Sequence, residues 1–137
     1  MLLPHEVIEK LKETKKKADK IKILKDNESW ALKDIIKGSM DPIVKWNLPA
    51  GSPPYTASRP ESTAASILRE NRKFRYLFKG GEGDRLPAYK RESIFIGILE
   101  GIHPGDAELV VAMINKETIK PLTKALVNEA FPGLLSS

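Results

Sequence analysis

Apolar residues recur at intervals of three and four through most of this chain, and that spacing puts them on one side of an α-helix. The first segment opens with Pro4, which suits the first turn of a helix. Its apolar seam then consists of Val7, Leu11, Thr14, Ala18 and Ile21. We therefore expect one helix from Pro4 to beyond Ile21, with its many lysines on the outer faces.

The same spacing predicts further helices along the chain. Before the glycine cluster at residues 80–83 they cover residues 27–38 with Asn27 as N-cap, 41–46 after Asp41 and Pro42, and 63–78. After Pro87 three more run through residues 89–99, 107–113 and 122–130, with Gly101 ending the first and Pro104 and Pro121 in the opening turns of the next two. Residues 94–96 would also suit a strand, but no partner strand exists. We predict an all-α fold of about six helices.

A Pro-rich irregular loop over residues 47–60 interrupts this pattern. It contains four prolines and has no apolar periodicity, so it is expected to be extended or polyproline-like. Soft internal boundaries are expected there and near residues 80–86. Neither half is large enough to form a secure domain, so residues 1–137 are predicted to be a single compact domain.

Residues that commonly carry catalysis or bind metals are scarce. The chain has no cysteine, which excludes disulfides and thiolate chemistry and favours an intracellular address. We expect His5 to be a solvated helix start and His103 to cap a helix turn, because neither has a partner at a metal-ligand spacing. The glycine cluster lacks the closing Lys-Ser/Thr of a phosphate loop and is interpreted as a turn between helices. We predict no catalytic residue, no metal and no cofactor.

Charge is distributed unevenly along the sequence. Residues 1–91 contain 20 Lys and Arg against 12 Asp and Glu, a net +8, whereas residues 92–137 contain 3 against 6, a net −3. A basic front half favours an anionic partner. No membrane partner is expected, because no run approaches the roughly 18 apolar residues of a membrane span and the basic first helix lacks Trp and Phe on its apolar face.

The predicted helix at residues 63–78 carries a basic stripe. At 100° per residue, five side chains fall within about 120° of one another and Arg75 lies at their margin; the five are Arg69, Arg72, Lys73, Tyr76 and Lys79. Arginine forks fit phosphate oxygens and tyrosine offers a stacking face. The stripe therefore suits DNA or RNA, with an ordinary solvated helix face as the alternative.

Two further segments could contact a protein partner. The first is the loop at Pro53, Pro54 and Tyr55, which either packs on the core or serves as a recognition segment. The second is the apolar C-terminal end, at Phe131, Leu134 and Leu135. Such a tail either tucks into the core or enters a partner's groove, and we favour tucking.

Four stretches together resemble a family of small uncharacterised proteins of T4-like tailed bacteriophages, including marine ones. They are DPIVKWNLP running into GSPPY at 41–55, FRYLFKGG at 74–81, RESIFIGILEGIHP at 91–104, and LTK with EAFPGL at 122–134. The resemblance implies a phage protein that acts in the host cytoplasm or in the virion, and it carries over no catalytic residue.

The first functional hypothesis is a non-enzymatic phage accessory protein that binds nucleic acid, or a nucleic-acid-processing machine, through the basic helix face. The first alternative is an adaptor or inhibitor that binds a host or phage protein through the Pro53–Tyr55 loop or the C-terminal tail. The second alternative is a minor virion or assembly component.

Overall fold

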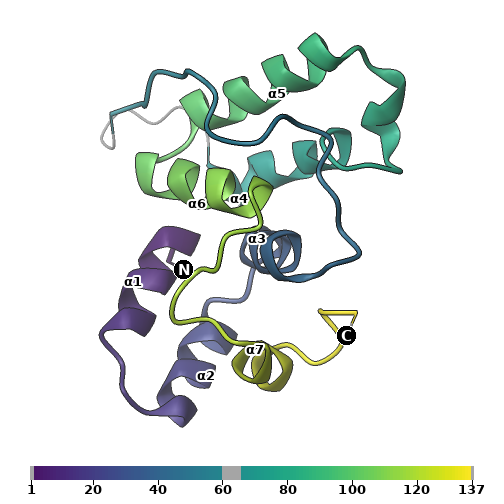
Figure 1. The fold of residues 1–137 in the computed structure, drawn as a ribbon. Coiled ribbons are helices and arrows are strands. Elements are labelled where there is room, and N and C mark those ends of the chain that lie inside the picture. The colour runs from purple at the N-terminus through teal and green to yellow at the C-terminus, as the bar shows by residue number, and fades with distance from the viewer. Residues whose placement is uncertain (1, 60–65, 137) are drawn as a thin grey trace.

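The computed structural model of the chain describes residues 2–59 and 66–136, which form seven α-helices and two 3₁₀ helices (Figure 1). In chain order they are α1 (Pro4–Lys12), α2 (Lys17–Asp26), α3 (Trp30–Met40), α4 (Ile67–Glu70), η2 (Asn71–Tyr76), η3 (Glu82–Arg85), α5 (Ala88–Gly101), α6 (Pro104–Ile114) and α7 (Lys124–Ala130). Among these residues the β-structure is confined to one antiparallel bridge, between Trp46 and Phe78. The predicted all-α fold in one compact domain is confirmed.

Helix α3 lies at the centre of the molecule. Figure 1 shows α1, α2 and α7 on one side of it and α4, α5 and α6 on the other. Helix α3 packs against α6 and against the α4–η2 segment, while α1 packs on α6 and α2 packs on α7. The side chains of Leu32, Ile35 and Ile36 on α3 are at most 2% exposed. Each such side chain contributes roughly 1.5–3 kcal/mol by its removal from water, so α3 is the element around which the core forms.

The first predicted helix is instead two helices, α1 and α2, which pack against each other. Thr14 lies in the break, where its hydroxyl donates a 2.7 Å hydrogen bond to the carbonyl of Lys10. A threonine side chain that bonds to the preceding turn competes with continued helix. The fold-back also buries Leu11 and Leu24, whereas Ala18, which the predicted seam turned inward, is exposed.

The ends of α3 also differ from the prediction. Asn27 is the C-cap of α2, not an N-cap, and Ser29 caps α3 by accepting a 3.1 Å hydrogen bond from the amide of Leu32. The helix then continues through Gly38 to Met40.

The short helix predicted after Asp41 and Pro42 does not form. The Asp41 carboxylate accepts a 3.0 Å bond from the Ile43 amide in a local turn. The chain then leaves the helical conformation, and Ile43 is 71% exposed instead of entering the core. Pro121 likewise precedes a helix without joining it, because α7 begins after Thr123, whose hydroxyl caps the amide of Leu126 at 3.1 Å.

The described part of the Pro-rich loop, residues 47–59, is irregular as predicted and runs across α5 and α6. Asn115 makes two hydrogen bonds with the backbone of Gly51, at 2.7 and 3.1 Å. Ser58 donates a 2.6 Å bond to the carbonyl of Ile102. Pro60, the last residue of the predicted loop, lies outside the described residues. Side-chain hydrogen bonds therefore hold the loop on the domain.

The C-terminal tail is tucked against the fold, as the sequence favoured. Phe131 is 5% exposed and Leu135 is 8% exposed. Ser136 donates its amide and its hydroxyl to the buried carboxylate of Asp41, at 3.0 and 2.8 Å. The tail thus returns to the C-terminal end of α3. Within the described residues, none of the helices has the length and apolar character required to cross a bilayer.

Candidate functional site

The segment that carries the predicted basic stripe is not one regular α-helix. Only α4 is α-helical, and the chain then tightens into η2, while the predicted start at residues 63–65 lies outside the described residues. In a 3₁₀ helix, side chains three residues apart lie above one another. The buried face of η2 is accordingly made by Asn71 and Phe74, followed by Leu77. Tertiary packing selects this period, because it turns these three side chains inward.

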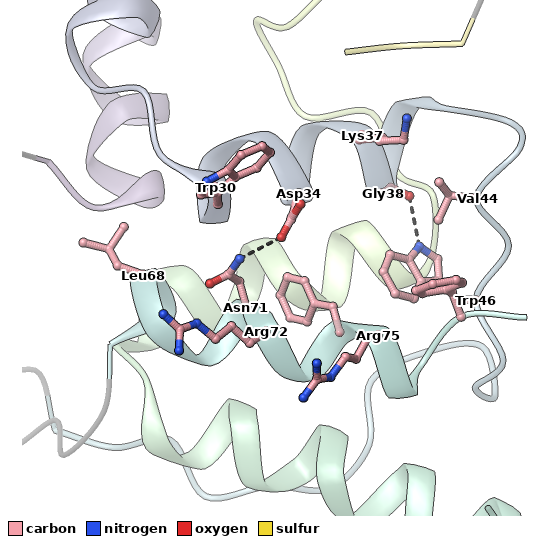
Figure 2. Close-up of a pocket in the computed structure, with 12 residues that line it drawn as sticks. Trp30, Asp34, Lys37, Gly38, Val44, Trp46, Leu68, Asn71, Arg72 and Arg75 are labelled. Atoms are coloured by element: carbon pink, nitrogen blue, oxygen red, sulfur yellow. Dashed lines mark hydrogen bonds between the residues drawn. The ribbon is translucent and has the colours of Figure 1, made fainter. Parts of the chain in front are cut away.

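The change of period divides the predicted stripe into two rows. Arg72 and Arg75 share one face of η2, and Arg69 precedes them by a further three positions; we call these three residues the arginine row. Figure 2 shows Arg72 and Arg75 along the same segment. Arg69 and Arg72 form no side-chain hydrogen bond or ion pair with the described part of the chain. Arg75 has one exposed and weak ion pair, at 3.8 Å from Glu82. The arginine row is therefore available to an anion.

The other members of the stripe belong to a second row. Lys73 forms a 2.9 Å ion pair with Glu70. The ring of Tyr76 lies 5.1 Å below the guanidinium of Arg75. Lys79 lines a separate recess, together with Asn47 and Arg91. The structure therefore does not bring all six predicted residues onto one surface.

Two members of the arginine row border a groove of about 600 Å³ between α3 and the α4–η2 segment (Figure 2). Four aromatic side chains line it, and we call it the aromatic groove: Trp30, Trp46, Phe74 and Phe78. Arg72 and Arg75 also line it, whereas Arg69 does not reach it. Small-molecule sites in proteins span roughly 300–1,000 Å³ and are mainly apolar with a few polar groups. The groove fits that description.

One end of the aromatic groove is built on Trp46. Its indole packs edge to face with Phe74 and Phe78, with ring centroids 6.2 and 6.4 Å apart. The indole nitrogen donates a 3.0 Å hydrogen bond to the carbonyl of Gly38. These contacts fix the ring, so this end of the groove is rigid. Trp46 is not among the site residues predicted from the sequence.

The other end is open and carries Trp30. This side chain is 74% exposed, and the ammonium of Lys33 lies 5.0 Å from its ring. Figure 2 shows Trp30 and Leu68 at the end of the groove away from Trp46. An exposed tryptophan beside a groove has a free aromatic face on which a flat ligand can stack.

A polar pair crosses the groove between these two ends. The side-chain amide of Asn71 donates a 2.7 Å hydrogen bond to Oδ2 of Asp34 (Figure 2). Burial raises the pKa of Asp34 above its ordinary value, and the Asn71 hydrogen bond and the charge of Lys37 offset part of this effect. A carboxyl with a perturbed pKa in a cleft is typical of functional sites. The Asp34–Asn71 pair could not be predicted from the sequence, because 37 positions separate the two residues.

The remaining predicted partner-binding residues lie elsewhere. Tyr55 is half-buried and packs on the core, while Pro54 is exposed. Leu134 is half-buried in the tucked tail.

The glycine cluster at residues 80–83 forms a turn, as predicted. The carboxylate of Asp84 accepts a 2.8 Å hydrogen bond from the amide of Gly80. This carboxylate accepts the backbone N–H that a bound phosphate would otherwise use.

The prediction that His5 is solvated is wrong. Its ring stacks on His103, with centroids 4.1 Å apart, and its Nδ1 lies 2.8 Å from Oδ1 of the buried Asp106. His103 caps α6 as predicted, with Nδ1 accepting a 2.9 Å bond from the amide of Gly105. His5 is covered because α1 packs on α6, which brings together residues about 100 positions apart in the sequence. The described residues contain no group of three or more His, Cys, Asp or Glu side chains suited to a metal ion.

Together these features define a class: a compact all-α protein with an aromatic groove bordered by arginines. The chain belongs to a family of unknown function, DUF6433, whose model matches residues 7–120. The match spans every residue of the aromatic groove and of the arginine row. No curated protein matches the chain significantly.

Proposed function

We propose that this protein is a non-enzymatic accessory protein that binds single-stranded nucleic acid, with the strand's backbone on the arginine row and a base in the aromatic groove. The observation that carries the proposal is the juxtaposition of the two features along η2. Single-strand binding proteins combine cations that follow the backbone with aromatic side chains on which bases stack.

The spacing of the arginine row suits a strand. A 3₁₀ helix rises about 2 Å per residue, so Arg72 and Arg75 are offset by about 6 Å along the axis. Two guanidinium groups at that offset can contact successive phosphates, each through a bidentate fork. A single strand is favoured over a duplex because the groove is a hollow for a ring, and duplex bases are already stacked.

The proposal is tested by fluorescence anisotropy of labelled single strands and duplexes at about 50 and 200 mM salt. Three phosphate contacts on a single strand predict a loss of affinity of about 20-fold over that interval. The variant Arg69→Ala/Arg72→Ala/Arg75→Ala should bind weakly at both salt concentrations. A matched control is Lys15→Ala/Lys16→Ala/Lys25→Ala, which removes the same charge from exposed positions outside the groove.

The two triple variants separate a site from general electrostatics. Equal losses in both would show that net charge alone attracts the strand. Absence of binding at 50 mM salt would refute the proposal.

The resemblance to proteins of T4-like phages supports the setting of an infected bacterial cell, with action in the host cytoplasm. A place in the virion is the alternative. Mass spectrometry of purified particles would distinguish them, since a virion component is recovered in a fixed copy number per particle.

A second candidate function is binding of a host or phage protein. The exposed Trp30 and the apolar walls of the aromatic groove favour it, because an amphipathic helix with acidic flanks would fit beside the arginine row. In that case Trp30→Ala should abolish capture of the partner in a pull-down, and binding should survive about 200 mM salt. The exposed Pro54 is a separate contact, which Pro54→Ala would test.

A further inference from the structure

The aromatic groove contains hydrogen-bond acceptors. A site that only stacks bases, without distinguishing one base from another, does not need them. Asn71 uses its amide N–H on Oδ2 of Asp34. Oδ1 of Asp34 and the side-chain oxygen of Asn71 accept no hydrogen bond from the described part of the chain. Neither oxygen is a fully buried atom without a partner, and both residues line the groove. The middle of the groove therefore presents acceptors to whatever enters it.

The positions of the charges restrict the occupant further. Arg72 and Arg75 lie along the edge of the groove, and the carboxylate of Asp34 lies within it. An occupant that suits both has an anionic part outside the groove and a flat part inside that offers hydrogen-bond donors. A nucleotide within a strand has this arrangement, with phosphates outside and the base inside.

The four bases differ in the donors that they present to a carboxylate. Guanine offers two adjacent donors on one edge, N1–H and the N2 amino group, which match the two oxygens of a carboxylate. Adenine and cytosine each pair one amino donor with a ring-nitrogen acceptor, and that acceptor would face an oxygen. Thymine and uracil flank their one N–H with two carbonyls. A carboxylate thus attracts guanine and repels the acceptor edges of the others.

Building on the proposed function, we infer that the aromatic groove is a guanine site within a single strand, in which Asp34 accepts hydrogen bonds from N1–H and N2–H of the base. Asn71 holds the carboxylate in place through one lone pair of Oδ2, and the second lone pair of Oδ2 can accept from the base beside Oδ1. Trp46, whose ring is fixed by Gly38, and Trp30 at the open end supply the stacking surfaces. A bond from a neutral donor to a carboxylate is stronger than one between neutral groups.

The experiment uses twelve-residue oligothymidylates with one central guanine, hypoxanthine, adenine or cytosine, titrated against the full chain. Hypoxanthine keeps N1–H and lacks only the N2 amino group. We expect the guanine strand to bind about 10-fold more tightly than the hypoxanthine strand, because one charge-assisted bond is lost. This comparison requires no change to the protein, so it stands even if a variant fails to fold.

Two variants then test the role of Asp34. Asp34→Asn should reduce the preference for the guanine strand over the hypoxanthine strand from about 10-fold to within about twofold. The control Asp19→Asn removes the same charge at an exposed position on α2 and should keep the preference. Thermal unfolding of each variant checks that the fold is intact.

The outcomes separate this inference from the proposed function. Equal binding of all four strands, with dependence on the arginine row retained, would overturn the guanine site alone. No binding of any strand would overturn both. If guanosine monophosphate binds as tightly as the guanine strand, a free nucleotide is the occupant and the inference of a strand is wrong. If an acidic amphipathic peptide binds where no strand does, the groove is a protein-docking site.

Discussion

Gly38 shows how one residue determines the shape of the aromatic groove. It lies in the last turn of α3, where Trp46 and Met113 both approach the helix. A Cβ atom at this position would lie 2.6 Å from Cζ2 of Trp46 and 2.7 Å from Cγ of Met113. Both distances are shorter than van der Waals contact, so a side chain here would displace the indole that forms one end of the groove.

We therefore expect Gly38→Ala to destabilise the protein by about 1–3 kcal/mol, despite the better helix propensity of alanine, because overpacking in the core costs that much. Urea unfolding followed by tryptophan fluorescence measures the change. The matched control is Gly97→Ala in α5, where a Cβ meets nothing within 4 Å. That variant should gain up to about 1 kcal/mol. Equal effects at the two positions would contradict the close approach of Trp46.

At the scale of elements, α1 is attached to α6 by the cluster of His5, His103 and Asp106. The carboxylate of Asp106 is 1% exposed and accepts a 3.0 Å bond from the His5 amide in addition to the contact with the ring. The His5 ring lies directly over Gly105, where a Cβ would approach it to 2.7 Å. The attachment of α1 thus depends on side chains from both helices.

We expect His5→Ala to destabilise the protein by about 1–3 kcal/mol, because Asp106 loses a partner while it stays buried. Hydrogen exchange should show the largest loss of protection in α1. His103→Ala removes the stacked ring and the cap of α6 but leaves Asp106 with His5, so its exchange should increase first at the start of α6. Uniform loss of protection in both variants would contradict the local role of each histidine.

Over the whole molecule, Asp41 connects the C-terminal end of α3 to the C-terminal tail. Burial by itself raises the pKa of this carboxyl, but hydrogen bonds from Ile43 and Ser136 and the charge of Lys37 outweigh it and lower the pKa to about 2. Its ordinary value is 3.8. Lys37 also donates a 3.0 Å bond to the carbonyl of Leu134. The ionised carboxylate therefore holds the C-terminal tail on α3.

This arrangement predicts a pH dependence of stability. Because the folded pKa lies below the unfolded one, the ionised Asp41 stabilises the fold above about pH 4, and the contribution is lost as the pH falls towards 2. The contribution of the ionised carboxylate to the free energy of unfolding is on the order of 1 kcal/mol, since solvent screens part of the effect. Asp41→Asn should thus be less stable than the wild type at pH 7, and the difference should shrink by pH 2.

Chemical unfolding at several pH values measures this difference. Deletion of residues 133–137 gives an independent check, since it removes both Ser136 contacts and the buried Leu135. The double change should lose less than the sum of the two single changes. A difference between wild type and Asp41→Asn that does not vary with pH would contradict the role of the ionised carboxylate.

Much of the fold could be predicted from local sequence. Helices α5 and α6 agree with the prediction because their apolar residues keep a helical period and Gly101 and Pro104 mark their ends. The irregular loop was recognised from its prolines. The predicted basic stripe divides into two rows, one of which is Arg69, Arg72 and Arg75, because a step of 100° per residue does not hold in the 3₁₀ helix η2.

The sequence by itself determined that this protein is helical, because helix period, caps and prolines act over a few residues. Only the tertiary structure decided that α1 and α2 fold back on each other, that η2 winds as a 3₁₀ helix, and that Asp34 meets Asn71. Each of these depends on contacts between distant segments, such as the packing of α3 on α4 and η2. The free energy gained by burying Phe74 and Leu77 in the core outweighs the small difference in free energy between the α and 3₁₀ conformations. A local sequence pattern does not reveal the free energy gained by burying these side chains against distant segments. The aromatic groove forms because of that burial.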